Sequence, residues 1–327
     1  MQIIVDNYGT FIGKTGNRFI IKTKKNVEEI SADKIDQIII LKASSVSTAA
    51  IKLACENNID IVYLDSLGKP YARIYPCKLG GTTLTRRRQA EIANTGRTLK
   101  ISIPIVQSKI RNQIYLLKSL EKTRKTINFC REIQILYNCI KNLKKLDGNL
   151  SEIRNTILGV EGFSSSIYFS CLSKILPFGE RQHKAKNLFN AMLNYGYGIL
   201  YSEIEKACIL AGLDPYLGLL HSDRYGKPSM VLDLIEIFRQ PIVDRAIITI
   251  FSHKQAKEAD ANISGNSLVL TKKGKKKVID AIFRRLHTKI NYKGRKLSFQ
   301  AIILDQCRLV SKFIREENYR YKPFCYR

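Results

Sequence analysis

Short runs of β-branched and aromatic residues follow one another through the first 76 residues of the chain. These runs read QIIVD, TFIG, RFIIKT, QIIIL, IDIVYLD and YARIYP. Turn-forming residues separate them at 7–9, 14–17 and 66–68, as is typical of successive strands. One segment differs, because SSVSTAAIKLACENN carries Ala50, Leu53 and Ala54 at helical spacing behind serine and threonine caps. The pattern predicts a small β-rich domain with one helix over residues 1–76.

The pattern changes after this domain. Residues 77–87 contain two glycines and no periodicity, which is typical of a linker. From residue 88 onward apolar positions recur at helical intervals, for example at Ile105, Ile110 and Ile114. Basic segments at 271–277 and 292–296 are expected to form turns on either side of a helix, and a last helix is expected over roughly 298–316. The sequence therefore predicts an α+β protein in which a large all-α domain, residues 88–327, follows the β-rich one.

Charge is the strongest feature of the composition. Lys and Arg number 55 against 28 Asp and Glu among 327 residues, a formal net charge of +27. This excess favours a polyanionic partner, most simply nucleic acid. The alternative is solvated surface charge without a partner. The hydrophobic fraction of 45% is enough for a proper core and argues against wholesale disorder.

The composition also excludes several classes of protein. The sequence has no run of about 18 uncharged apolar residues, so we expect no membrane span. The N-terminus MQIIVDNYGTFIG lacks the layout of a signal peptide. The eight cysteines are scattered without a C-x-x-C pair, which favours reduced thiols over a zinc ribbon or a disulfide framework. We therefore expect a cytoplasmic protein.

Two acids interrupt an apolar helix near residue 235. The helix is expected to start at Pro228, and Pro241 is expected to end it or to begin the next one. Asp233 and Glu236 are three residues apart and so share one face. Buried carboxylates cost several kcal/mol each unless they are paired or bind a cation. Either a cation site or a structural Glu236–Arg239 ion pair would explain them.

Two further residues can join these acids. Glu161 lies in an apolar context between two glycines, and a continuous helix would put it on one stripe with Ile157 and Tyr168. The alternative is that Glu161 caps a helix that restarts after Gly159. His221 precedes the loop HSDRYGKP and can fold back over the acids, or it can be an ordinary packing histidine.

Glu161, His221 and Glu236 together offer two carboxylates and one imidazole, with Asp233 nearby. An oxygen-rich site with one nitrogen suits Mn²⁺ or Mg²⁺ better than zinc or copper. In a strongly basic protein, such an ion would neutralise charge at phosphorus and activate an attacking hydroxyl. The residues therefore predict a metal-dependent enzyme that acts on nucleic acid.

Four ordered segments carry a resemblance to a known family. They are GVEGFSSSIYF, NAMLNYGYGIL, AGLDPYLGLLHSDRYGKPSMVLDLIEIFRQPIVDR and YKPF. They resemble the CRISPR-associated protein 1 family, the integrase and endonuclease subunit of CRISPR adaptation. The resemblance implies Glu161, His221 and Glu236 as ligands of Mn²⁺ or Mg²⁺, with Asp233 as an additional catalytic acid. It departs at residues 178–189, where many members carry an arginine- and proline-rich loop and this chain has no proline.

The same resemblance implies partners and a reaction. We expect a homodimer that acts on double-stranded DNA, both the foreign fragment and the CRISPR repeat, with a dimer of CRISPR-associated protein 2 as a bridge. The 3′-hydroxyl of the fragment would attack a repeat phosphodiester. A free-standing metal nuclease and a non-catalytic DNA-binding scaffold are the two alternatives.

The sequence also offers candidate residues for contacts with DNA. Tyr168 and Arg224 lie in the motifs and could meet the scissile phosphate, although packing or an ion pair would explain them as well. Basic side chains of the C-terminal part are candidates for backbone contacts, with a solvated face as the alternative for each. These candidates are Lys272, Lys273, Lys275, Lys276, Arg284 and Arg285.

Overall fold

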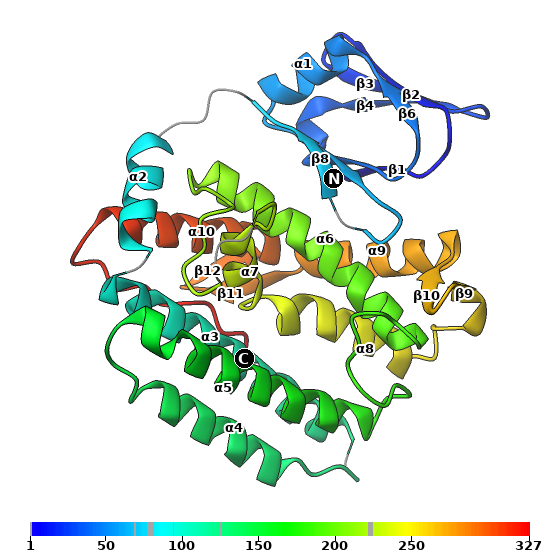
Figure 1. The fold of residues 1–327 in the computed structure, drawn as a ribbon. Helices are drawn as coiled ribbons and strands as arrows, with labels where there is room; N and C mark the ends of the chain where they lie inside the picture. Colours follow the sequence, from blue (N-terminus) through cyan, green and yellow to red (C-terminus); the bar gives the residue numbers. More distant parts are fainter. Residues whose placement is uncertain (1, 69, 77–81, 94, 125, 222–224) are drawn as a thin grey trace. The chain divides into compact units, whose positions relative to one another are not determined.

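The computed structural model describes residues 2–68, 70–76, 82–93, 95–124, 126–221 and 225–327 (Figure 1). The chain divides into two compact units, Met1–Gly80 and Gly81–Arg327. The described residues contain no helix long and apolar enough to cross a membrane.

The N-terminal unit is built from two four-stranded sheets and one α-helix. Its strands are β1 (Gln2–Val5), β2 (Thr10–Thr15), β3 (Arg18–Lys22), β4 (Val27–Ser31), β5 (Gln37–Ile40), β6 (Ser44–Val46), β7 (Asp60–Leu64) and β8 (Pro70–Ile74). The strand orders are β4-β3-β2-β6 and β1-β5-β7-β8. The pairs β1–β5, β5–β7 and β2–β6 are parallel, and the others are antiparallel. The β-rich prediction for this part of the chain is confirmed.

The one α-helix among the described residues of this unit, α1 (Thr48–Glu56), begins where the sequence places its cap. The Ser47 hydroxyl accepts a hydrogen bond from the backbone N–H of Ala50. Ala50, Leu53 and Ala54 are buried, as their helical spacing predicts. They join a core that also contains Ile12, Phe19, Ile38 and Ile61 from the strands.

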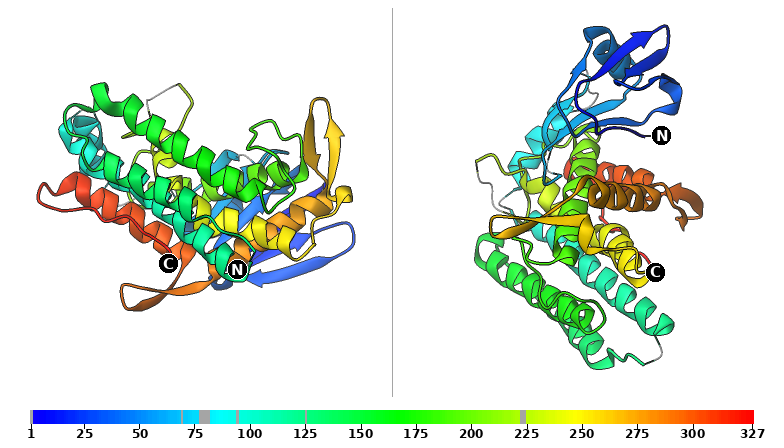
Figure 2. Two further views of the ribbon diagram at one scale, coloured as in Figure 1. Left: turned by 90° about the horizontal axis from the view of Figure 1, so that it is seen from below. Right: turned by 90° about the vertical axis from the view of Figure 1, so that its right-hand side faces the viewer.

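The C-terminal unit is mostly helical. Its helices are α2 (Thr82–Ile92), α3 (Leu99–Thr123), α4 (Cys130–Leu143), α5 (Leu150–Ser173), α6 (Leu188–Leu210), α7 (Ser229–Ile235), α8 (Arg245–Ser252), α9 (Lys272–His287) and α10 (Phe299–Arg315). The helices α3, α4 and α5 pack against one another, and α6 contacts α7, α9 and α10 (Figures 1 and 2). The α+β prediction is therefore confirmed for the whole chain.

Three details of the sequence prediction are wrong. The C-terminal unit is not all-α, because it contains the hairpins β9 (Ala261–Ser264) with β10 (Ser267–Leu270), and β11 (Lys289–Tyr292) with β12 (Arg295–Ser298). Residues 82–87, expected in the linker, form the start of α2. The basic segment 271–277 is the capped start of α9 rather than a turn, because the Thr271 hydroxyl accepts from Gly274 N and Gly in a helix is only mildly unfavourable.

One helical segment is irregular, and it carries part of the candidate site. After α7 the chain turns at residues 236–238, forms the π-helical segment η3 (Arg239–Asp244) and continues as α8. Pro241 therefore lies inside this irregular segment rather than at a helix boundary. Proline has no N–H, so the Ile237 carbonyl lacks its helical partner. The Asn112 side chain of α3 donates to that carbonyl at 2.8 Å, and π-helical segments are frequent at functional sites.

Candidate functional site

Two carboxylates from different helices converge on one buried ammonium group. Glu161 lies in α5, and Glu236 caps the C-terminal end of α7. The Lys109 Nζ of α3 pairs with Glu161 Oε1 and lies 2.5 Å from Glu236 Oε2. The exposed fractions of the Lys109, Glu236 and Glu161 side chains are 6%, 8% and 18%. This cluster is therefore largely shielded from water.

Glu161 is held within an unbroken helix. The helix α5 runs through both neighbouring glycines, so the alternative of a cap after Gly159 is wrong. The hydroxyls of Ser164 and Ser165 donate to the Glu161 carbonyl at 2.8 and 2.9 Å. Ile157 and Tyr168 are buried on the same helix, as the predicted stripe requires.

Asp233 organises the loop that carries His221. It is buried, and its carboxylate accepts from the backbone N–H groups of Leu219, Leu220 and His221 at 2.6, 3.0 and 3.0 Å. The His221 Nδ1 lies 2.7 Å from Asp233 Oδ1. A ring whose Nδ1 donates to a carboxylate presents Nε2 as its ligating nitrogen when the ring is neutral. Asp233 thus acts on the site through His221.

The charges of the cluster favour the ionised forms of Glu236 and Lys109. Burial opposes the ionised form of Glu236, but the charges of Arg239 and Lys109 outweigh it and lower the Glu236 pKa. Burial likewise opposes the charged form of Lys109, but Glu236 and Glu161 outweigh it and raise the Lys109 pKa. Arg239 Nη2 lies 2.9 Å from Glu236 Oε1. The predicted Glu236–Arg239 ion pair is therefore present.

His221 belongs to the same electrostatic cluster. Burial opposes its protonation, but the hydrogen bond to Asp233 and the charges of Asp233, Glu236 and Glu161 raise its pKa. Two pairs of the proposed catalytic residues are therefore in place: Glu161 and Glu236 share Lys109, and Asp233 holds the His221 ring.

Lys109 is the member of this cluster that the sequence analysis missed. It lies off the apolar stripe of α3, and periodicity alone places such a lysine in solvent. In the structure a second face of α3 is buried as well, including Ser108 and Asn112 on either side of Lys109. The sequence does contain a sign that this second face is buried, because several small or amide side chains occur along this helix.

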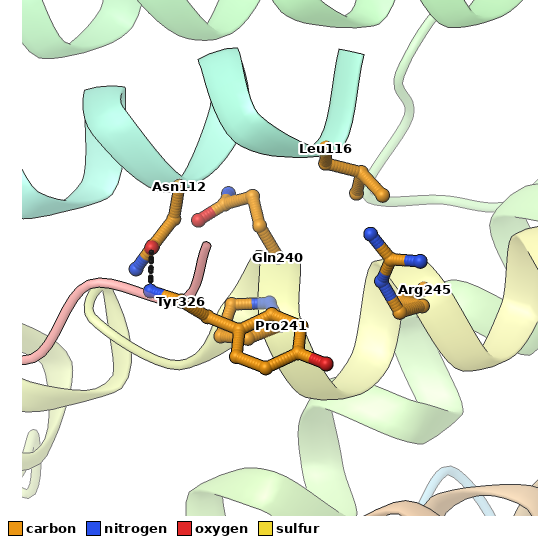
Figure 3. A pocket seen from close by; sticks show the side chains of 6 residues that line it. All are labelled: Asn112, Leu116, Gln240, Pro241, Arg245 and Tyr326. Atoms are coloured by element: carbon orange, nitrogen blue, oxygen red, sulfur yellow. Dashed lines mark hydrogen bonds between the residues drawn. The ribbon is translucent and has the colours of Figure 1, made fainter. Parts of the chain in front are cut away.

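The C-terminal tail covers that second face. The Ser108 hydroxyl donates to the Phe324 carbonyl, and the Tyr326 N–H donates to Asn112 Oδ1 at 2.8 Å. The Phe324 ring stacks on Phe238, two residues after Glu236, with centroids 5.8 Å apart. Figure 3 shows the Asn112–Tyr326 bond beside a small pocket. Asn112, Leu116, Gln240, Pro241, Arg245 and Tyr326 line that pocket. The YKPF motif therefore supports the elements that carry Lys109 and Glu236.

One of the predicted DNA contacts is wrong. Tyr168 is fully buried, and its hydroxyl donates to Asp244 at 2.8 Å, beside Tyr197, which donates to the same carboxylate at 2.5 Å. It is thus engaged inside the protein rather than facing a ligand. Arg285 is half-buried; its Nε donates to the Pro241 carbonyl at 2.7 Å and its guanidinium lies over the Phe299 ring, and a DNA contact by Arg285 stays a prediction.

The other predicted contacts lie mainly on α9. Lys272, Lys273, Lys276 and Arg284 are exposed, and Lys275 is half-buried over the Tyr195 ring. Arg224 lies outside the described residues. DNA binding by the described lysines stays a prediction.

Comparison with known proteins decides the family. The model of the family "CRISPR associated protein Cas1" matches residues 3–284. The chain is a member of the Cas1 family. It is 33% identical to the CRISPR-associated endonuclease Cas1 1 of Archaeoglobus fulgidus, over 99% of either chain. It is 32% identical to that of Francisella tularensis subsp. novicida, over 100% of this chain and 99% of the relative.

Solved structures of similar fold agree with this assignment. A casposase bound to its integration product is 25% identical and superposes with a TM-score of 0.84, over 97% of this chain and 91% of that one. A Cas1 protein from Thermotoga maritima shares the fold with a TM-score of 0.82 and 19% identity, over 99% of this chain and 100% of that one. The two-unit α+β architecture is therefore the Cas1 fold.

The donor set of the cluster fits a hard divalent cation. Two carboxylates already point at one positive charge, and the imidazole of His221 is close enough for their charges to raise its pKa. Among the described residues no group of His, Cys, Asp and Glu is arranged as a ready metal site. In this Cas1 chain the Lys109 ammonium contacts both carboxylates.

Proposed function

We propose that this Cas1 protein is a metal-dependent DNA endonuclease and integrase that inserts foreign DNA fragments into a CRISPR array. The observation that carries this proposal is the convergence of Glu161 and Glu236 on one buried cation position. The charges of these two carboxylates also help to raise the His221 pKa. The curated relatives are named endonucleases, and the casposase neighbour was solved bound to an integration product.

The residues take distinct roles in this proposal. Glu161, His221 and Glu236 would hold Mn²⁺ or Mg²⁺, and Asp233 orients the His221 ring and the backbone before it. The bound ion would neutralise charge on the phosphodiester and lower the pKa of the attacking hydroxyl. Arg239, next to Glu236, adds a fixed positive charge at the same place.

The proposed reaction is a transesterification. The 3′-hydroxyl of the fragment loses its proton as its oxygen forms a bond to phosphorus in the repeat. The original phosphorus–oxygen bond of the repeat breaks, and the departing 3′-oxygen takes up a proton. The number of phosphodiesters is unchanged, so the step needs no external energy source. Attack by water in place of the hydroxyl gives cleavage at the same centre.

The proposed partners follow from the family and its solved assemblies. We propose a homodimer bridged by a Cas2 dimer and bound to double-stranded DNA. A Cas6-RT-Cas1–Cas2 complex shares the fold of this chain, with a TM-score of 0.78 and 18% identity, over 99% of this chain and 36% of that one. The net charge of +27 supports binding to DNA.

A joining assay tests the proposal. The protein, its Cas2 partner and Mn²⁺ are mixed with a supercoiled plasmid that carries the repeat and with a labelled fragment. We expect label to enter the plasmid with 3′-hydroxyl ends and not with 3′-deoxy ends. The Glu236→Gln variant should remain folded and lose joining.

The alternatives give different results in the same assay. A free-standing nuclease cuts the plasmid without joining the fragment, even with the partner present. A DNA-binding scaffold shows the same DNA handling for the wild type and for Glu236→Ala. Either result contradicts the integrase proposal.

A further inference from the structure

Lys109 and Arg239 already place positive charge against Glu161 and Glu236, and a metal ion that binds these carboxylates must compete with it. The Lys109 Nζ contacts one oxygen of Glu161 and one of Glu236, and Arg239 contacts the other Glu236 oxygen. Two carboxylates and two cations sum to a formal charge of zero. These four side chains thus balance one another without a metal ion, in surroundings that are largely shielded from water.

The position of Lys109 is set by packing rather than by chance contact. Its side chain is 6% exposed, and its helix is held on both sides of it. Ser108 and Asn112 bind the C-terminal tail, and Asn112 also binds the Ile237 carbonyl beside Glu236. The contacts of its helix and its burial therefore place the Lys109 ammonium at the two carboxylates when no metal is bound.

We propose that Lys109 is the built-in counter-cation of the Cas1 metal site, occupying the position between Glu161 and Glu236 until a divalent ion displaces it. This inference rests on the proposed function, since it assumes that Glu161 and Glu236 hold the metal. It assigns Lys109 a positioning role: the residue holds the two carboxylates together without metal and competes with the ion for them.

Competition between Lys109 and the metal ion for the two carboxylates predicts in which direction Mn²⁺ affinity changes when the lysine is removed. A divalent ion entering beside an ammonium group meets a like charge at short range, which weakens binding. Removing the ammonium removes that repulsion and leaves two buried carboxylates without their shared partner. Lys109→Met should therefore bind Mn²⁺ more tightly than the wild type and be less stable without metal.

The experiment is a calorimetric titration of the full chain with Mn²⁺ alone, in the absence of DNA. We expect Lys109→Met to bind Mn²⁺ at least about tenfold more tightly than the wild type, equivalent to about 1.4 kcal/mol. Lys109→Arg, which keeps the charge, should bind no more tightly than the wild type. Lys118→Met is the matched control, because Lys118 is an exposed lysine of the same helix whose ammonium donates to the Tyr137 hydroxyl and lies over the Tyr137 ring. It should leave Mn²⁺ affinity unchanged.

Thermal unfolding adds a second readout that does not involve activity. In EDTA, Lys109→Met should melt at a lower temperature than the wild type. Saturating Mn²⁺ should raise its melting temperature by more than it raises that of the wild type, because the ion replaces the missing positive charge. If Lys109→Met does not fold in EDTA, Lys109→Gln and acetylation of the wild type are used instead. Mn²⁺ should then increase the acetylation of Lys109 relative to Lys118.

The outcomes separate this inference from the proposed function. If the wild type binds Mn²⁺, Glu161→Gln abolishes binding and Lys109→Met binds no more tightly than the wild type, the counter-cation role is wrong and the metal site stands. Unchanged acetylation of Lys109 in Mn²⁺ has the same meaning. If neither the wild type nor any Lys109 variant binds Mn²⁺, the metal dependence of the proposed function is wrong as well.

Discussion

At the scale of single residues, Asp233 makes more hydrogen bonds to neighbouring segments than its position in an apolar helix suggests. Its carboxylate accepts three backbone N–H groups and faces the His221 ring. A buried carboxylate with so many donors is difficult to replace, because an amide offers fewer acceptor sites and adds donors of its own. Asp233 therefore links the fold of the 219–221 segment to the orientation of the proposed ligand.

Asp233→Asn should lower the free energy of unfolding by about 3 kcal/mol, since at least one buried donor loses its charged acceptor. Urea denaturation in EDTA measures this change without any contribution from metal. The control is Asp280→Asn at an exposed position of α9, which should change stability by less than about 0.5 kcal/mol. Equal effects of the two substitutions would contradict the role given to Asp233.

His221 should make stability depend on pH. Its pKa in the folded protein is raised above 6.5, despite burial, by Asp233, Glu236 and Glu161. A base whose pKa is raised on folding stabilises the protein fully below the unfolded pKa of about 6.5 and loses that contribution as the pH rises through the folded pKa. The size is about 1.4 kcal/mol for each unit by which folding raises the pKa.

The measurement is urea denaturation in EDTA of the wild type and of His221→Gln between pH 5.5 and 9, a range chosen to bracket about 6.5. The stability advantage of the wild type should be largest at the acid end and shrink toward alkaline pH. An advantage that grows with pH would mean that folding lowers the pKa of His221.

At the scale of elements, close packing of α6 fixes where η3 lies. Gly196 of α6 has no room for a side chain, because an added Cβ would lie 2.8 Å from Val243 Cγ1 in η3 and 3.5 Å from Ile282 Cδ1 in α9. The π-helical segment begins three residues after Glu236, so the packing of η3 on α6 helps to position that carboxylate. A glycine in NAMLNYGYGIL thus serves packing and indirectly serves the site.

Gly196→Ala should destabilise the protein by about 1–3 kcal/mol, since the neighbouring side chains must shift to admit the added methyl group. Gly159→Ala on α5 is the matched control, because its added Cβ meets nothing within 4 Å. The control should be stabilising by about 0.5–1 kcal/mol, as expected for glycine to alanine within a helix. Thermal and urea unfolding of the two variants should therefore shift in opposite directions, and a shared sign would contradict the packing interpretation.

At the scale of the whole molecule, the basic side chains differ in whether they are paired inside the fold or exposed on its surface. Some basic side chains are structural, such as Lys277, whose Nζ lies 2.5 Å from the buried Asp260 carboxylate. Others on the same helix are exposed, namely Lys272, Lys273 and Lys276. The formal charge of +27 therefore overstates the charge available to a polyanion, and individual lysines must be distinguished by their surroundings.

A salt titration of DNA binding separates these two kinds. Replacing Lys272, Lys273 and Lys276 with glutamine should reduce the slope of log K against log salt by about 0.9 for each DNA phosphate that the variant no longer neutralises. Lys277→Gln should leave the slope unchanged and lower stability instead, because Asp260 loses its partner. Fluorescence anisotropy with labelled duplex DNA at several NaCl concentrations measures the slope. An unchanged slope in the triple variant would show that this face does not touch DNA.

The sequence by itself determined the α+β class, the β-rich start, and the buried face of α1. It also pointed to Glu161, Asp233 and Glu236, because acids inside apolar helices stand out against a hydrophobic pattern, and to His221 in a loop that can fold back over them. These features depend on short-range periodicity and on residue chemistry, which the order of residues contains directly.

Only the tertiary structure decided the rest. Lys109 looked like a solvated lysine until the C-terminal tail was seen to bury the second face of α3, and Tyr168 looked accessible until Asp244 was found against it. The periodicity of a single helix shows only whether one of its faces is apolar. The side chains that meet in the folded protein are decided by contacts between segments far apart in the chain. The balance of two carboxylates by Lys109 and Arg239 is a property of the assembled fold.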